Sequence, residues 1–219
     1  MMTEIGAYAG NIDTNPLRAD IDEAGKMVGV DFILNVVLDE HKKIVKAYAG
    51  DPVIAHRAAC EYLRGMFGIP IDRRADIVIC SQGGAPKDLN LYQTQKALDN
   101  AKHAVKDGGI IILVGACQEG LGGNVFEKWM TGAASPDELI VKIRENFVLG
   151  GHKAAAIAMV LKKADIYMVS KMDEKLVRSI FMKPFSTLRG AYAAAQRKFH
   201  GEGTVITMPY GGSTLPINE

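Results

Sequence analysis

The chain has 219 residues, of which 48% are hydrophobic and 23% charged, a composition typical of a folded globular protein and not of a disordered one. Its 26 Lys and Arg residues and 25 Asp and Glu residues leave a net charge of +1, so no broad electrostatic binding to nucleic acid or to an anionic membrane surface is expected. The apolar runs are far shorter than the ~20 residues of a membrane-spanning helix, and MMTEIGAYAG lacks the pattern of a secretory signal. Three widely spaced cysteines without a C-x-x-C pair suit a reducing compartment, so we expect a cytoplasmic protein.

Residues 1–74 are predicted to form a small α+β segment that leads into the rest of the chain. Apolar residues at three- and four-residue spacing predict an amphipathic helix over 17–28. The β-rich runs DFILNVVLD and IVKAYAG, on either side of the polar connection EHKK, predict a β-hairpin. Asp51 and Pro52 then begin a second helix, VIAHRAACEYLRGMF.

Residues 75–219 alternate between short apolar runs and helical patterns, which predicts an α/β domain. Strands that are apolar on both faces and separated by helices indicate a mostly parallel sheet covered on both sides, a three-layer, Rossmann-like sandwich. The expected strands are 75–81, 110–116, 165–170 and 203–209.

The loop after the first of these strands, SQGGAPKDLN, carries the first candidate site. Ligands of open parallel sheets bind beyond the carboxyl ends of the strands. Gly83 and Gly84 permit a positive φ, and the helix behind them is expected to offer free N–H groups to an anion. Tyr92, Gln93 and Lys96 lie in the first turns of that helix, where a phenol, an amide and an ammonium group could bind a small hydroxy acid. The spacing alone favours the alternative interpretation, a glycine-containing turn with a solvated lysine and a half-buried tyrosine.

Two further loops carry polar residues that could line a pocket. CQEGLGG offers Glu119 and Gly120, while Cys117 lacks a basic partner nearby and is not expected to be a nucleophile. In GGHKAAA, His152 begins a helix, whose positive end should lower the pKa of the imidazole; a surface capping histidine is an equally good interpretation. No His, Asp or Glu cluster has the spacing of metal ligands, so we expect no metal site in this chain, and the catalytic residues stay unassigned.

Together these stretches resemble the C-terminal half of the nickel-dependent lactate racemase family. The resemblance rests on DFILNVVLDEHKKIVKAYAGDPVIAHRAA, GGAPKDLNLYQTQKAL, GACQEGLGG and TVITMPYGGSTLP, in family order over most of the chain. It implies two α/β domains with the active site between them, residues 1–74 being the tail of the N-terminal domain and 75–219 the C-terminal domain. It also implies that Tyr92, Gln93 and Lys96 line the substrate pocket and, with weaker support, that Glu119 and the glycines near it belong to a pocket loop.

The resemblance also implies what this chain does not supply. The family uses a nickel-pincer nucleotide, tethered to a lysine, that accepts and returns hydride at the carbon bearing the hydroxyl. The tethering lysine, the metal-ligating histidine and the proton-moving histidine pair belong to the N-terminal half, so we expect no cofactor in this chain and a missing half in cis or in trans. The family's lactate enzymes carry a tryptophan near the position of GGHK, which favours another 2-hydroxy acid here, with His152 as a possible contact.

The sequence therefore predicts the substrate-side part of a 2-hydroxy-acid racemase or epimerase, inactive alone. The alternative from another class is a non-catalytic module, either a subunit that docks on a separately encoded cofactor-bearing half or a small-ligand sensor; its bare apolar surface could drive homo-oligomerisation. An unrelated nucleotide-binding α/β enzyme is a third alternative, although the chain lacks a phosphate-binding fingerprint.

Overall fold

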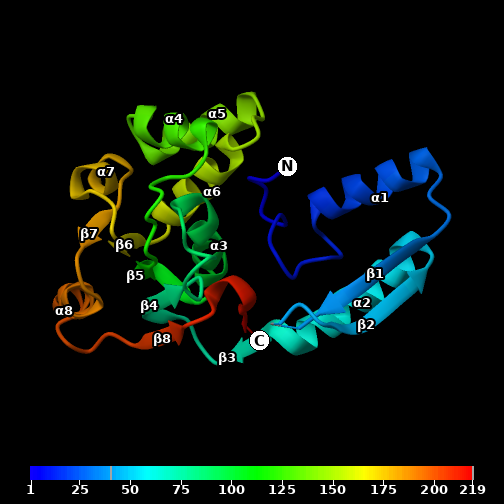
Figure 1. Ribbon diagram of the computed structural model, residues 1–219, viewed down its shortest axis with the longest axis horizontal. Helices are drawn as coiled ribbons and strands as arrows, with labels where there is room; N and C mark the ends of the chain where they lie inside the picture. Colours follow the sequence, from blue (N-terminus) through cyan, green and yellow to red (C-terminus); the bar gives the residue numbers. More distant parts are fainter. Residues whose placement is uncertain (40, 219) are drawn as a thin grey trace. The chain divides into compact units, whose positions relative to one another are not determined.

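The computed structural model describes residues 1–39 and 41–218, in two compact units, Met1–Gly68 and Ile69–Glu219 (Figure 1). Glu40, in the connection EHKK, lies outside the described residues. None of the helices described is long and apolar enough to cross a membrane.

The first unit consists of two helices and a two-stranded antiparallel ribbon, which confirms the predicted hairpin. Its elements are α1 (Pro16–Val28), β1 (Ile33–Leu38), β2 (Ile44–Gly50) and α2 (Pro52–Phe67). Both helices begin at a side-chain cap followed by proline: Asn15 accepts the N–H of Leu17, and Asp51 accepts two N–H groups of α2. Gly29, at φ +73°, ends α1 in the left-handed conformation that glycine adopts without strain.

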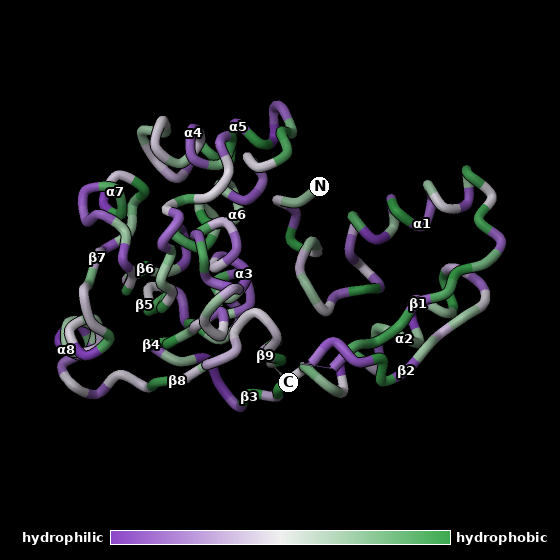
Figure 2. The backbone as a smooth tube through the Cα atoms, viewed as in Figure 1, coloured by the Kyte–Doolittle hydropathy of each residue, from purple (hydrophilic) through white to green (hydrophobic). Residues whose placement is uncertain are grey.

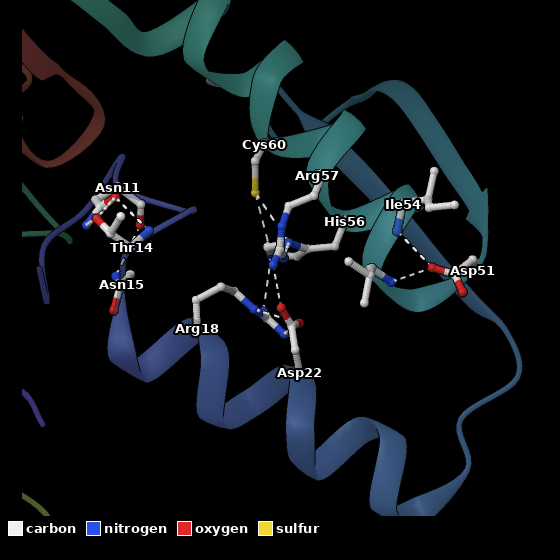
Figure 3. A network of polar contacts seen from close by, with 11 residues as sticks. Asn11, Thr14, Asn15, Arg18, Asp22, Asp51, Ile54, His56, Arg57 and Cys60 are labelled. Atoms are coloured by element: carbon white, nitrogen blue, oxygen red, sulfur yellow. Dashed lines mark hydrogen bonds and ion pairs between the residues drawn. The ribbon is translucent and has the colours of Figure 1, made fainter.

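A cluster of charged side chains joins α1 to α2 (Figure 3). Asp22 of α1 accepts hydrogen bonds from Arg18, one turn before it, and from Arg57 of α2. His56 lies against both guanidinium groups and 3.5 Å from the sulfur of Cys60. Burial, assisted by the two arginines, lowers the pKa of His56, so the imidazole is neutral at pH 7. The cluster therefore links the two helices through ion pairs. The carboxylate of Asp22 pairs with both arginines, and the neutral imidazole of His56 lies beside them.

The ribbon has one covered face and one bare apolar face. Val37 is buried, and α2 contacts both strands. Alternate residues point the other way, and in this register Leu34 lies opposite Ala49, and Val36 opposite Ala47. Leu34 is 67% exposed and Val36 45%, and Figure 2 shows the hydrophobic colour along β1. Within the residues that the structure describes, this face of the first unit is therefore an uncovered apolar surface.

The second unit contains a five-stranded sheet in the order β7-β6-β5-β4-β8, in which each neighbouring pair is parallel. The strands of this sheet are β4 (Ala75–Ser81), β5 (Val105–Val114), β6 (Asp165–Val169), β7 (Lys183–Phe185) and β8 (Val205–Met208). The helices are α3 (Leu91–Ala101), α4 (Asn124–Gly132), α5 (Pro136–Glu145), α6 (Gly151–Leu161), α7 (Glu174–Ser179) and α8 (Leu188–Lys198).

Helices cover the sheet on both faces, so the predicted three-layer α/β fold with a mostly parallel sheet is confirmed. On one face, Ile77, Ile110 and Ile112 pack with Ala191 and Ala195 of α8. The alternate strand residues face the other way, towards α3 and α6, which contact β4, β5 and β6. A sheet apolar on both faces needs both layers, since each layer removes one set of aliphatic side chains from water.

Three short strands escaped the sequence prediction. They are β3 (Gly68–Ile71), which pairs with β9 (Leu215–Asn218), and β7 at the sheet edge. Each has three or four residues and contains a proline, so neither length nor alternation distinguishes them from loops. The edge strand β7 follows directly on α7, which ends at Ser179.

After β4, the chain adds β5, β6 and β7 in turn on one side of that strand. It then returns to the other side, where β8 pairs with β4. Asp76, at the start of β4, holds this closing strand: its carboxylate accepts hydrogen bonds from Thr204 and Lys106. The bonds from Lys106 and Thr204 lower the pKa of Asp76 to about 2. The reversal of strand order places the loops after β4 and β8 next to each other, where ligands of such sheets bind.

Candidate functional site

The loops that follow β4 and β5 are joined by hydrogen bonds in front of α3. The backbone N–H groups of Leu91 and Tyr92 donate to the carbonyls of Gly120 and Leu121, at 3.0 Å each. Asp88, 7% exposed, accepts the Ala116 N–H at 2.8 Å through its carboxylate. The C-x-E-G-x-G loop is therefore fixed across the start of α3, and it holds that helix in place.

This arrangement corrects one expectation from the sequence: the first turn of α3 does not offer free N–H groups to an anion. Leu91 and Tyr92 donate to the loop after β5, while Gln93 and Thr94 donate to the Asn90 cap. The sequence could not show this, because the acceptors lie about thirty residues further along the chain. An acid bound here would have to be held by side chains.

Gly83 and Gly84 adopt the positive φ that the sequence suggested, +94° and +78°. A Cβ atom on Gly83 would lie 2.9 Å from the ring of Tyr210, which follows β8, whereas Gly84 faces open space. Gly83 therefore permits the close approach of two loops at the point where the strand order reverses. A direct contact of either glycine with a ligand stays a prediction.

The three polar residues predicted on α3 form two contacts instead of one triad. The Lys96 ammonium donates to the side-chain oxygen of Gln93 at 2.8 Å, and Lys96 is exposed. Tyr92 is half-buried and packs edge-to-face on Phe126 of α4, with ring centroids 5.6 Å apart. Gln93 and Lys96 are thus brought together on the surface of α3, while Tyr92 turns towards α4 and α6.

Lys153, the third residue of α6, lies beside Tyr92 and was missed by the sequence reasoning. Its Nζ lies 4.9 Å from the centroid of the Tyr92 ring and donates to Gln95 Oε1 at 3.0 Å. Gln95 is 3% exposed, so α3 holds Lys153 through a buried amide. Burial and the nearby charge of Lys96 lower the pKa of Lys153. The available signal was the position of Lys153 in GGHK, beside the predicted pocket residue His152.

Glu119 and Gly120 both take part in the loop contacts. Asn90 uses its two side-chain atoms at once: Oδ1 accepts the Gln93 N–H at 3.1 Å, and Nδ2 donates to Glu119 Oε2 at 3.0 Å. Glu119 therefore braces the cap of α3, and Gly120 provides a carbonyl to α3. Cys117 is buried, and burial raises the pKa of its thiol to about 11, which agrees with the expectation that it is not a nucleophile.

His152 is half-buried and is engaged by the loop before α6. Its ring stacks on Phe147, with centroids 5.8 Å apart, and its Nδ1 accepts the Gly150 N–H at 3.1 Å. The pKa of His152 is lowered, as expected, by burial and then by the charge of Lys153. The contacts shown place the ring against residues 147–150, so a substrate contact of His152 stays a prediction.

The nickel-pincer nucleotide needs ligands for a metal ion, and the residues present do not fit that need. In residues 1–39 and 41–218, no group of three or more His, Cys, Asp or Glu side chains is placed to hold a metal ion. Close to the candidate site, two lysines and two amides are present, which are donors for an anion and poor ligands for a cation.

The fold and these residues define an α/β protein with a candidate site for a small anion at the carboxyl edge of a parallel sheet. Comparison with known proteins agrees with the family resemblance. Residues 71–215 match the family described as "Lactate racemase C-terminal domain". The lactate racemase of Thermoanaerobacterium thermosaccharolyticum is 33% identical over 95% of this chain, and that of Lactiplantibacillus plantarum is 32% identical over 94%. This chain belongs to the lactate racemase family.

Solved structures agree with this assignment. The lactate racemase apoprotein from T. thermosaccharolyticum superposes with a TM-score of 0.91 and 31% identity, over 99% of this chain and 53% of that one. A protein from Thermotoga maritima superposes at 0.66 with 17% identity, over 94% of this chain and 54% of that one, and so shares the fold. The chain spans about half the length of the curated relatives it matches, 50% and 49% of them.

Proposed function

We propose that this chain is the C-terminal, substrate-side part of a racemase or epimerase that acts on a small 2-hydroxy acid. The observation that carries the proposal is the pair Gln93 and Lys96 on the surface of α3, with Tyr92 and Lys153 in contact beside it, in a chain that belongs to the lactate racemase family. Its relatives are named lactate racemases, and lactate is a 2-hydroxy acid.

In this proposal the side chains of α3 bind and orient the acid. Lys96 neutralises the carboxylate, and its bond to Gln93 leaves two ammonium hydrogens for the ligand. Gln93 and Tyr92 supply an amide and a phenol for further hydrogen bonds, which fix the hydroxyl-bearing carbon. Gly83, Gly84, Glu119, Gly120 and His152 would then line or support the pocket. The metal, the hydride acceptor and the base belong to the other half, with the nickel-pincer nucleotide as the family's cofactor.

Ligand titration tests the binding part of the proposal. We expect 2-hydroxy acids to shift the NMR signals of α3 residues in the 219-residue chain, and Lys96→Met to weaken this binding at least about tenfold, because it removes a charge-assisted hydrogen bond. Lys175→Met, an exposed change on α7, is the matched control. Unchanged affinity in Lys96→Met would show that Lys96 does not bind the carboxylate. Racemase activity of the purified, cofactor-free chain would contradict the assignment of the metal, the hydride acceptor and the base to the other half.

The first unit supports a second candidate function, that of a subunit which docks on a separately encoded cofactor-bearing half. Its apolar ribbon face, formed by Leu34, Val36, Ala47 and Ala49, is the kind of surface that the missing half of an α/β domain would cover. We propose that this unit is the tail of the N-terminal domain, completed in cis or in trans.

Co-expression tests whether this face is an interface. The N-terminal half of the T. thermosaccharolyticum lactate racemase should co-purify with the chain, and Val36→Asp should reduce the yield of complex. Thr187→Asp, on the second unit, is the control. If the chain instead forms a homo-oligomer that Val36→Asp dissociates, a second copy covers the face.

Free cysteines at all three positions support a cytoplasmic location for either assembly.

A further inference from the structure

His56 lies in the contact between α1 and α2, with an arginine beside each of its two ring nitrogens (Figure 3). Arg18 Nη1, from α1, is 3.4 Å from Nε2 of the ring, and Arg57 Nη1, from α2, is 3.1 Å from Nδ1. A guanidinium group can only donate hydrogen bonds, and a neutral imidazole has one nitrogen that accepts them. The neutral ring therefore accepts from one of the two arginines, whereas a protonated ring would accept from neither.

Two arginines and one acid act on the His56 ring. Both carboxylate oxygens of Asp22 are already used, because Oδ1 accepts from Arg18 at 2.5 Å and Oδ2 pairs with Arg57. Within residues 1–39 and 41–68, these three groups supply the charge that acts on His56, and the Cys60 thiol is the other titratable group beside the ring. A protonated His56 would place three positive charges against one negative charge in a half-buried contact, which is costly.

α1 is shielded from solvent mainly where this cluster covers it. No residue of α1 is buried, so little apolar packing holds the helix on α2. The side chains of Arg18 and Asp22 are 19% and 16% exposed, whereas Ile21 is 55% exposed and Met27 82%. The attachment of α1 to α2 therefore depends on the ion pairs of Asp22, whose two arginines also lie against the His56 ring.

The protonation equilibrium of His56 agrees with this geometry. Burial lowers the pKa of His56, the charges of Arg18 and Arg57 lower it further, and Asp22 opposes the change. A histidine on a detached, solvated helix would keep its ordinary pKa of about 6.5. Below that pH the detached state binds a proton that the attached state does not, so each pH unit shifts the equilibrium up to about tenfold towards detachment. At higher pH the ring is neutral in both states, and the equilibrium does not depend on it.

We propose that His56 is a pH-sensitive switch, which keeps α1 attached to α2 while its ring is neutral and releases α1 when the ring is protonated. Release would expose the side of α2 that carries His56 and Cys60 and would free the acid and the arginines for solvent. The switch is built from residues of the first unit and does not depend on the hydroxy-acid site of the second unit.

Amide hydrogen exchange in the 219-residue chain, followed by NMR between pH 5 and pH 8, tests the switch. After correction for the intrinsic exchange rate, the protection of α1 amides should be constant from pH 7 to 8 and should fall up to about tenfold per pH unit below ~6.5. His56→Gln keeps an acceptor for one arginine and cannot be protonated in this range, so it should remove the pH dependence. His41→Gln, at an exposed histidine of the same unit, is the matched control and should retain it. Asp22→Asn should lower the protection at least about tenfold already at pH 8.

The ring signals of His56 in the unchanged chain provide a second measurement that needs no variant. They should titrate with a midpoint below pH ~6.5, and the amide signals of α1 should change at the same midpoint. Circular dichroism at pH 8 establishes that each variant is folded. Unprotected α1 amides at pH 8, protection that stays constant down to pH 5, or a pH dependence that survives in His56→Gln would each overturn the switch.

Discussion

Gly122 allows the loop after β5 to lie directly on the Asn90 cap of α3, and replacing it by alanine should disrupt that contact. The new Cβ would lie 2.4 Å from Cγ of Asn90 and 2.7 Å from its Oδ1. Asn90 cannot move away without breaking its bonds to Gln93 and Glu119. The φ of +92° at Gly122 adds about 1 kcal/mol of strain for an L-residue, loss of the cap about 1 kcal/mol, and the overlap about 1 kcal/mol or more. We expect a total loss of about 3 kcal/mol.

Gly120→Ala is the matched control in the same loop. Gly120 also has a positive φ, +68°, but a Cβ there would meet open space, so only the strain of about 1 kcal/mol applies. Urea unfolding followed by the fluorescence of Trp129, the only tryptophan, measures the second unit selectively. Equal losses for the two variants, within about 0.5 kcal/mol, would refute the packing argument. Asn90→Ala combined with Gly122→Ala should recover only the overlap with Cγ and Oδ1 of Asn90, because the Cβ atom at position 90, 2.7 Å from the new Cβ, remains.

Three further predictions concern packing, acid stability and thiol chemistry in the folded chain. Gly151→Ala should cost about 1–3 kcal/mol and alter the fluorescence of Trp129, because the added Cβ would lie 2.7 Å from the indole; thermal unfolding measures the loss. Asp76→Asn should destabilise the chain by about 1–2 kcal/mol at pH 7, because the lowered carboxylate pKa of about 2 contributes stability above pH ~4. In urea unfolding, the difference in stability between this variant and the wild type should shrink as the pH falls from ~4 to ~2. A thiol reagent should modify Cys60 before the two buried cysteines, as mass spectrometry of the modified chain would show.

Each of these predictions has a control and a contrary outcome. Gly132→Ala, at the end of α4 with open space around the new Cβ, should leave stability nearly unchanged; a loss equal to that of Gly151→Ala would contradict the contact with the indole. Asn at position 76 keeps the size of the side chain, so a difference that persists unchanged at pH 2 would show that charge is not the cause. For the thiols, Cys60→Ser should abolish the fast reaction, and a fast reaction of Cys80 would contradict its burial and its pKa of about 12.

The main elements could be predicted from the sequence because local patterns control them. The alternation of β4, β5 and β6 with helices, the hairpin of β1 and β2, and the start of α2 at Asp51 each depend on residues close together in the chain. The short strands β3, β7 and β9 could not be predicted, because their partners lie on distant segments and their own length carries no periodicity.

The candidate site shows the same division between local and long-range information. The sequence by itself determined that Gln93 and Lys96, one turn apart on a helix, would meet, since helical geometry places such residues side by side. Only the tertiary structure decided that Lys153 lies over the ring of Tyr92 and that the loop after β5 occupies the N–H groups of Leu91 and Tyr92. Both depend on how α6 and that loop pack against α3. Packing joins residues far apart in the chain by complementary shape and hydrogen bonds, and no spacing within one segment encodes those contacts.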